Sequence, residues 1–244
     1  MASIISSTTL TTTTKAQWHF VLHGGCSETC ADADRQRETI ENLQAVAESV
    51  TRALNQGATA KEAVVLAVAG LEDCPTFNAG HGAALNENGI HQVSPFTRDR
   101  YYVLTIRQLE AGLVDGASKT YGAVGLLETT KNPIRLANEL LEHGPHTIMV
   151  GTAADDMAKK LGLETVPNSY FSTAFRKGLW ERSKGNKIVS GANGTVGAVV
   201  LDSYGQLAAG GSTGGGTGKM DGRLGDTAIL GAGLYADDRV SVVW

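Results

Sequence analysis

Residues 194–202 read GTVGAVVLD and mark the sharpest change of composition in the chain. The preceding residues 183–193 are rich in Ser, Gly, Lys and Asn and offer little to bury. The apolar, β-branched run that follows Gly194 predicts a buried strand beginning at or next to Thr195. The sequence therefore predicts a loop-to-strand junction with a threonine at its start.

A threonine preceded by glycine at such a junction is the arrangement from which an N-terminal nucleophile is released. Gly194 lets the backbone adopt angles that other residues resist, and the Thr195 hydroxyl can then attack the preceding carbonyl. Hydrolysis of the resulting ester would cut the chain. The new α-amine, with an ordinary pKa of about 7.7–8.0, can act as general base for the hydroxyl of the same residue. On Gly-Thr alone an ordinary buried strand is the better interpretation, so the hypothesis depends on the neighbouring motifs.

Five further glycine-containing motifs accompany this strand: His23-Gly24-Gly25, residues 78–83 (NAGHGA), Asp115-Gly116, residues 210–215 (GGSTGG) and residues 222–226 (GRLGD). In this order and spacing they make the chain similar to the plant-type L-asparaginase / isoaspartyl peptidase family. This family consists of Ntn hydrolases and has glycosylasparaginase and threonine aspartase among its relatives. The similarity runs from about Phe20 to Asp238, without a stretch near 91–108.

The resemblance implies an α+β fold, a four-layer αββα sandwich with two stacked, mostly antiparallel sheets and Thr195 opening a central strand. It divides the chain into an α-subunit portion, residues 18–194, and the start of a β-subunit, residues 195–244. Residues 164–194 are expected to form a mobile linker, and Ser/Thr-rich residues 1–17 a disordered extension. Family members continue further with more strands and a third active-site threonine. We therefore expect an incomplete C-terminus, and expect residues 1–244 alone to cleave slowly or not at all.

The resemblance also assigns roles to individual residues. Thr195 is the expected nucleophile, released by cleavage between Gly194 and Thr195, and Thr213 is the second threonine that orients it. Arg223 is expected to grip the α-carboxylate of an L-aspartyl substrate, since a guanidinium can bind a carboxylate through two hydrogen bonds. Asp226 is expected to receive the α-ammonium group. Asn78 is a candidate for contacting the substrate or for ordering the loop.

A structural sodium ion is a further implication of the resemblance. In the family a turn-rich loop surrounds this ion with main-chain carbonyls, here those of Leu71, Glu72, Cys74, Phe77, Ala79 and His81. Hard cations prefer oxygen ligands, although carbonyl sites leave no side-chain signature in a sequence. We interpret the His81 side chain as a loop histidine without a catalytic part, and we expect no catalytic cofactor.

The function implied is hydrolysis of the side-chain amide of L-asparagine and of β-aspartyl (isoaspartyl) peptides through an acyl-enzyme. Substrates would carry a free α-amine and a free α-carboxylate, and the full-length form would be a homodimer of αβ units. Two alternatives stay open: a glycosylasparaginase-type amidohydrolase, and an inactive Ntn-like protein that keeps an aspartate-shaped pocket. The donors of the oxyanion hole are not assigned.

Composition excludes several other classes of function. The formal net charge of −4 provides no basic field for nucleic acid or an anionic membrane, and no apolar run reaches membrane-spanning length. The cysteines, Cys26, Cys30 and Cys74, are odd in number and no secretory signal is evident, which favours reduced thiols in the cytoplasm. Cys26 and Cys30 lack a second pair at zinc spacing. A phosphate-binding loop at residues 214–220 fails because Thr213 and Met220 occupy positions that this motif requires to be Gly and Ser/Thr.

Hydrophobic periodicity and turn residues predict the remaining elements. Thr59 and Glu62 form a capping-box pattern for a helix through Leu71, and Asn132-Pro133 opens another helix with Asn132 as the capping residue. Other strands are predicted over 18–22, 122–127, 147–150, 196–201 and 206–209, and helices over 37–55 and 153–161. Residues 91–102 are inserted relative to the family. They either line a substrate entrance, form a solvated loop or reflect an error in the coding sequence.

Overall fold

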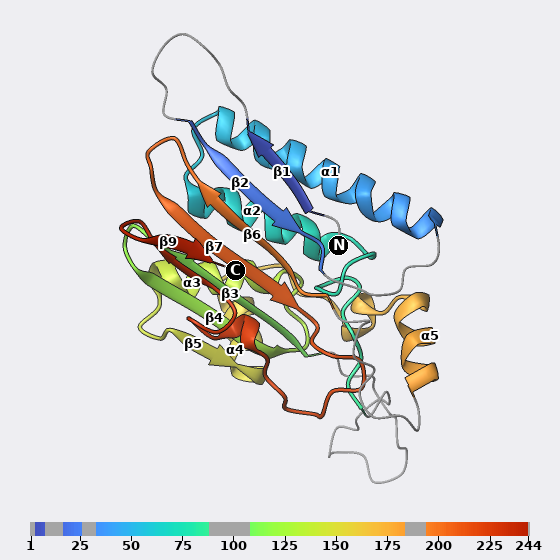
Figure 1. Cartoon of the computed structure of the whole chain (residues 1–244). Helices are drawn as coiled ribbons and strands as arrows, with labels where there is room; N and C mark the ends of the chain where they lie inside the picture. The colour runs from blue at the N-terminus through green and yellow to red at the C-terminus, as the bar shows by residue number, and fades with distance from the viewer. Residues whose placement is uncertain (1–2, 8–16, 26–32, 88–107, 184–193, 244) are drawn as a thin grey trace.

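The computed structural model describes residues 3–7, 17–25, 33–87, 108–183 and 194–243. At its centre lies a seven-stranded sheet in the order β1-β2-β6-β7-β3-β4-β5 (Figure 1). β5 is parallel to β4, and all other neighbours are antiparallel. The strands are β1 (Ser3–Ser7), β2 (His19–His23), β3 (Leu109–Asp115), β4 (Thr120–Leu127), β5 (Ile148–Val150), β6 (Val196–Leu201) and β7 (Leu207–Thr213).

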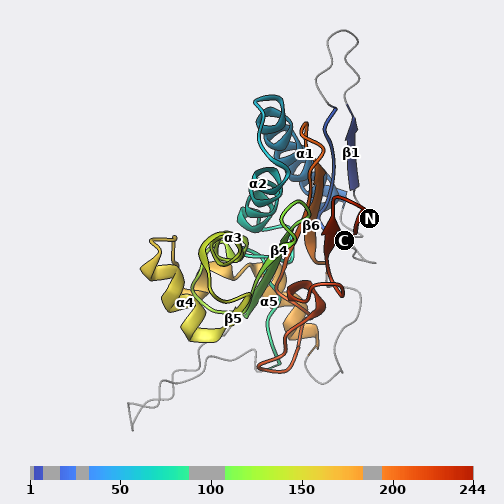
Figure 2. The same cartoon turned by 90° about the vertical axis from the view of Figure 1, so that its left-hand side faces the viewer.

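Helices cover one face of this sheet, as Figure 2 shows from the side. They are α1 (Ala33–Asn55), α2 (Ala60–Asp73), α3 (Pro133–His143) and α4 (Gly151–Lys160). Alternate residues of β6, among them Val196, Ala198 and Val200, are buried in the core beneath these helices. Gly210 of β7 allows α2 to come close, because a Cβ at that position would lie 2.6 Å from Cγ1 of Val64. The largest part of the core therefore lies between the helices and the sheet.

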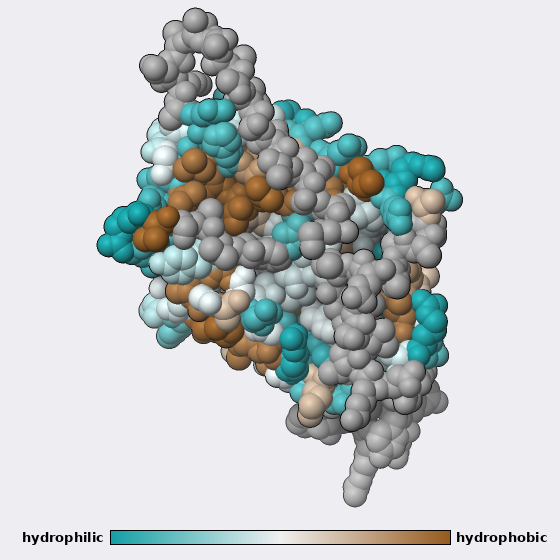
Figure 3. Space-filling model, in the orientation of Figure 1, coloured by the Kyte–Doolittle hydropathy of each residue, from teal (hydrophilic) through white to brown (hydrophobic). Residues whose placement is uncertain are grey.

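A second, two-stranded antiparallel sheet, β8 (Tyr235–Asp237) and β9 (Ser241–Val243), packs against the other face. Its apolar contacts with the large sheet form a small cluster of Val114, Ala209, Leu234 and Ala236. Exposed apolar residues also remain on this side, which Figure 3 shows in brown. The fold is thus α+β as expected, with helices, a large sheet and a small sheet as successive layers. No helix long and apolar enough to cross a membrane occurs among the described residues.

The capping residues predicted for α2 and α3 show where a local hydrogen bond forms and where a tertiary contact replaces it. The capping box of α2 is confirmed: Thr59 Oγ1 accepts from Glu62 N at 3.3 Å, and Thr59 N donates to Glu62 Oε2 at 2.9 Å. For α3 the predicted positions are confirmed, with Asn132 at the N-cap and Pro133 as the first helical residue, but the Asn132 side chain makes no capping bond. Its Nδ2 instead donates to Asp73 Oδ1 at 3.1 Å, joining α3 to α2.

Three other predicted segments differ from the structure. The return strand predicted over 206–209 runs from Leu207 to Thr213, because it pairs with β6 on one side and β3 on the other along this length. Residues 3–7, expected to be disordered, form β1 at the edge of the sheet beside β2. Within the expected linker lie a 3-10 helix η1 (Asn168–Phe171) and α5 (Ala174–Ser183). Mobility of the linker stays a prediction, and residues 184–193, the 91–102 insertion, Cys26 and Cys30 lie outside the described residues.

Tertiary contacts explain why α5 forms within the segment expected to be a mobile linker. Trp180 Nε1 donates to Asn86 O at 3.0 Å, and the buried Arg176 donates through Nε to Gly82 O. Since both partners belong to the loop after α2, the sequence pattern of the α5 segment alone does not reveal these contacts.

Candidate active site

Thr195 immediately precedes β6, and the strand register shows what lies beside it. Val196 pairs with Ser212 of β7, so Thr195 is placed opposite Thr213. Thr213 in turn pairs with Glu110 of β3. Thr195, Thr213 and Glu110 therefore form a row across three neighbouring strands at one end of the sheet, which we call the threonine row.

The threonine row faces away from the helices. Val196 and Ala111, the next residues along their strands, are buried in the core beneath the helices. Successive side chains of a strand point to opposite faces, so the row points to the side of the small sheet. Thr195 is half-buried, whereas Thr213 and Glu110 are buried. The predicted nucleophile and its orienting threonine are thus brought together.

Thr213 is fixed by the glycine turn that follows it. Its Oγ1 accepts a hydrogen bond from Gly215 N at 2.9 Å. This bond occupies an acceptor lone pair of the hydroxyl and not its proton. The hydroxyl thus keeps the ability to donate, which a residue orienting Thr195 requires.

The end of β2 packs against the predicted cleavage site. Gly25 has a φ of +98°, and a Cβ on it would lie 2.5 Å from Gly194 Cα and 3.2 Å from Thr195 N. Only glycine fits such a position without displacing backbone. His23 Nδ1 accepts from Gly25 N at 3.1 Å, and burial lowers the pKa of His23 to about 4. The imidazole is therefore neutral at pH 7, and it binds the backbone of Gly25, the residue that packs against Gly194.

The loop with Arg223 and Asp226 is fastened to the start of β3, where the sequence had not indicated site residues. Glu110 Oε2 accepts from Gly225 N at 2.6 Å, and its Oε1 lies 3.3 Å from Arg223 Nη1. Gln108 Oε1 accepts from Gly222 N at 3.1 Å. The signal available in the sequence was an acidic residue, Glu110, in the segment before the Asp115-Gly116 motif.

Lys219 is a second residue that sequence reasoning did not assign. It is buried, and its Nζ donates to Gln108 O at 2.6 Å and to Gly214 O at 2.8 Å. Burial raises the pKa of Glu110, whereas Lys219, the Gly225 N–H and Arg223 act in the opposite direction. The pKa of Glu110 is raised overall, so the positive charges only partly offset the cost of burying this carboxylate beside Thr213.

Arg223 and Asp226 are both exposed. The side chain of Arg223 is 43% exposed and lies next to the turn after Thr213, since a Cβ on Gly215 would be 2.9 Å from Arg223 Nη1. Asp226 begins the short helix η2 (Asp226–Ala228) and contributes to the electrostatics of Glu110. The loop therefore presents one cation and one anion to solvent near the threonine row.

Asn78 uses both ends of its side-chain amide within the protein. Nδ2 donates to Gly215 O at 2.8 Å, and Oδ1 accepts from Ala84 N at 2.8 Å. Its carbonyl also accepts from Gly214 N at 2.9 Å. These three bonds favour the loop-ordering interpretation of Asn78 over direct contact with a substrate.

The segment proposed to surround sodium begins inside α2, because the helix extends to Asp73. The chain closes on itself where His81 N donates to Glu72 O at 2.7 Å. Carbonyls of Leu71 and Cys74 likewise accept one backbone N–H each, and a carbonyl has two lone pairs. A closed loop rich in carbonyl oxygens fits a hard cation. The ring of His81 lies 4.6 Å from that of Tyr170, a packing contact.

The chain is similar to several known proteins. A family model described as Asparaginase matches residues 16–100 and 103–243. The isoaspartyl peptidase of Escherichia coli strain K12 is 37% identical over 231 residues, which cover 89% of this chain and 67% of that protein. A probable isoaspartyl peptidase/L-asparaginase 2 of Arabidopsis thaliana is 34% identical, with 91% and 72% covered. The human isoaspartyl peptidase/L-asparaginase is 35% identical, with 91% and 68% covered.

Proposed function

Because the chain belongs to the asparaginase family of Ntn-type hydrolases, we propose that Thr195 makes it an amidohydrolase of L-asparagine and β-aspartyl (isoaspartyl) dipeptides. Proteins of this family act on small-molecule or peptide substrates. The observation that supports this choice of substrate is the threonine row, with the Arg223–Asp226 loop bound beside it through Glu110.

Maturation comes first in this proposal. Thr195 Oγ attacks the Gly194 carbonyl, the Thr195 nitrogen leaves as an amine, and water hydrolyses the ester. The products are a carboxylate on Gly194 and an N-terminal Thr195 with a free α-amine. Close packing of Gly25 against Gly194 supports a fixed geometry for the attacked peptide.

Catalysis then uses the same hydroxyl. The α-amine of Thr195 accepts the hydroxyl proton while Oγ attacks the side-chain carbonyl of the substrate. The leaving amine departs with a proton, and water hydrolyses the β-aspartyl ester to give L-aspartate. Arg223 binds the α-carboxylate, Asp226 binds the α-ammonium group, and Thr213 orients the nucleophile.

Four further elements belong to the proposal and rest on the family resemblance. A sodium ion bound by carbonyls of residues 71–81 stabilises the loop that contains Asn78, without taking part in the chemistry. The protein requires no catalytic cofactor, works in the cytoplasm and forms a homodimer of αβ units.

Denaturing electrophoresis with N-terminal sequencing tests the nucleophile. We expect a new N-terminus reading Thr-Val-Gly-Ala, and Thr195→Ala should abolish both the cleavage and all turnover. Thr120→Ala, which removes an exposed threonine at the start of β4, serves as the matched control and should leave both unchanged. Cleavage that persists with alanine at position 195 would refute the assignment of Thr195.

Assays of L-asparagine, a β-aspartyl dipeptide and glycosylasparagine side by side test the substrate. The proposal expects release of L-aspartate from the first two. Preferred turnover of glycosylasparagine would support the glycosylasparaginase alternative, and no turnover of any of the three would support the inactive alternative.

A further inference from the structure

Glu110 occupies an irregular position in the sheet. Leu109 pairs with Leu127 and Ala111 with Val124, so β4 has two residues, Gly125 and Leu126, where β3 has Glu110 alone. Leu126 has a φ of +54°, which is uncommon for a leucine. Such β-bulges change the direction of the side chains beside them.

The same bulge receives the loop that carries Arg223. A Cβ on Gly125 would lie 2.2 Å from Cδ1 of Leu224, so the Leu224 side chain of the loop packs directly on the bulge. Glu110 then binds the loop from the other strand, through the 2.6 Å contact with Gly225 N. Bulge and carboxylate therefore fix the loop at two consecutive residues.

Glu110 and Arg223 differ in how far their side chains are exposed to solvent. The side chain of Glu110 is 2% exposed, whereas that of Arg223 is 43% exposed. Their contact uses one guanidinium nitrogen, Nη1, at 3.3 Å. A guanidinium carries five N–H donors, so the contact with Glu110 uses only a small part of the hydrogen-bonding capacity of Arg223, while the buried carboxylate determines its position.

Besides positioning Arg223, Glu110 affects the net charge of the site. Among the residues that the structure describes, the charged groups that act on it are Lys219, Arg223 and Asp226. Together with Glu110 they make two cations and two carboxylates, with no formal net charge. Removing the charge of Glu110 would leave a net positive site in a partly buried region, where charges are weakly screened. A neutral site suits a zwitterion, and a positive site suits an anion.

We propose that Glu110 is a positioning and specificity-determining residue, which holds Arg223 in place and makes the site select zwitterionic α-amino acids over carboxylates without an α-amine. This inference rests on the proposed function, because it assumes that Arg223 binds the α-carboxylate of the substrate. Glu110 acts through Arg223 and the Gly225 backbone, without touching the substrate.

Isothermal titration calorimetry with L-aspartate and succinate tests it, because succinate has the same carbon skeleton without the α-amine. For Glu110→Gln we expect at least about tenfold weaker binding of L-aspartate, in line with the loss of a charged hydrogen-bond partner. Succinate should lose less affinity, so the preference for aspartate should fall. In the amidohydrolase assay, KM for L-asparagine should rise about tenfold while kcat changes less.

Two further variants keep the proposal falsifiable. Glu110→Asp keeps the charge and should restore the preference for aspartate over succinate. Asp202→Asn alters a different buried carboxylate that binds loop backbone at the opposite end of the sheet, and should change neither KM nor the preference.

Outcomes separate this inference from the proposed function. Equal weakening of both ligands by Glu110→Gln, or the same change in Asp202→Asn, would show a merely structural role and overturn it. Wild-type affinity in Glu110→Gln would also overturn it. If the wild-type protein prefers L-aspartate, and loses that preference in Glu110→Gln, but hydrolyses no amide, the proposed function fails and the role of Glu110 stands.

Discussion

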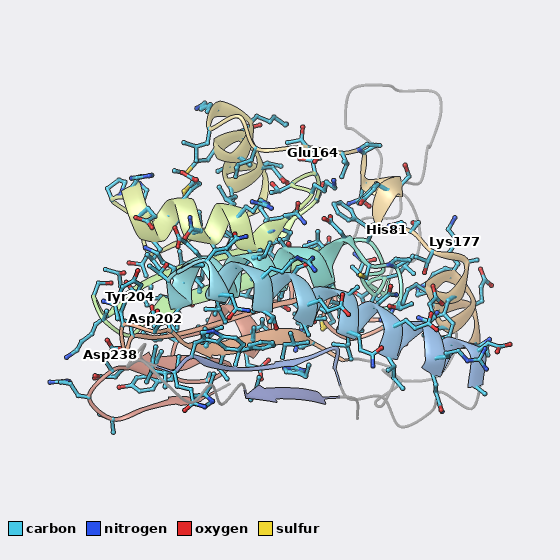
Figure 4. The ribbon with its side chains drawn as sticks, turned by 90° about the horizontal axis from the view of Figure 1, so that it is seen from above. His81, Glu164, Lys177, Asp202, Tyr204 and Asp238 are labelled. Atoms are coloured by element: carbon cyan, nitrogen blue, oxygen red, sulfur yellow. The ribbon has the colours of Figure 1, made fainter. Side chains whose placement is uncertain are left out.

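The two ends of the large sheet each contain a buried carboxylate that binds loop backbone, and they use it differently. At the β6–β7 hairpin, Asp202 accepts from Ala60 N, Tyr204 N and Gln206 N at 2.8–3.0 Å. Figure 4 shows Asp202 and Tyr204 near Asp238 at this end, with His81 and Lys177 at the other. At the threonine row, Glu110 accepts from one backbone N–H, that of Gly225, and forms an ion pair with Arg223. Asp202, which binds backbone N–H groups, therefore stabilises the fold, whereas Glu110, which also pairs with the half-exposed Arg223, positions a residue of the candidate site.

Two glycines with positive φ provide the strongest test of this difference. Gly25, beside the cleavage site, would place a Cβ 2.5 Å from Gly194 Cα. Gly57, near the hairpin, would meet only Tyr204 Oη at 3.6 Å. Gly25→Ala should therefore slow cleavage after Gly194 by about 100-fold or more, as expected for displacement of reacting groups by about 1 Å.

Gly57→Ala is the matched control, measured by the same electrophoretic time course. Its φ of +91° makes alanine unfavourable by about 1–2 kcal/mol in stability, with cleavage unchanged. Equal cleavage rates in the two variants would contradict the assigned contact between β2 and the scissile peptide.

A smaller effect is expected at the hairpin carboxylate. Asp202→Asn replaces one acceptor oxygen by an amino group that faces backbone N–H groups, so a buried donor loses its partner. We expect a loss of about 2 kcal/mol in the free energy of unfolding, measured by urea denaturation in the uncleaved Thr195→Ala background. A decrease below about 0.5 kcal/mol would show that these bonds do not hold the hairpin end.

The smallest effect concerns pH and the two histidines of β2. Because burial lowers the pKa of His23 from 6.5 to about 4, the unfolded state binds more protons between these values. Stability is then fully present above pH 6.5 and falls as pH decreases toward 4, by about 1–2 kcal/mol between pH 7 and pH 5. His23→Gln should flatten this slope in urea titrations of Thr195→Ala protein. His19→Gln, at the exposed other end of the strand, should leave it intact.

Elements defined by local chemistry could be predicted from the sequence. The capping box of Thr59 places the start of α2, and the composition change at Gly194 places β6 within one residue. The family motifs correctly brought Thr195 and Thr213 to one site, because both follow directly from strand positions in a hairpin.

Residues whose role depends on distant partners could not be found in this way. Glu110 meets Gly225, and Lys219 meets Gln108, across more than 100 residues of sequence. Asn132 has the sequence features of a cap, yet its amide contacts α2. Arg176 lies in the segment predicted to be a mobile linker, yet it is buried and donates to Gly82 O. Local patterns contain no information about such pairings.

The strand order also decides when during synthesis the nucleophile can be assembled. β6 and β7 join β2 on one side to β3 on the other, although β2 is made more than 170 residues before β6. Such distant pairings form slowly, so Gly25 reaches Gly194 and Glu110 reaches Thr213 only after the ribosome has released the central hairpin. Cleavage after Gly194 would then remove the covalent connection that brought the strands together. From that moment the two fragments would be held by side-chain packing and strand pairing alone, and their reassembly after unfolding would depend on protein concentration.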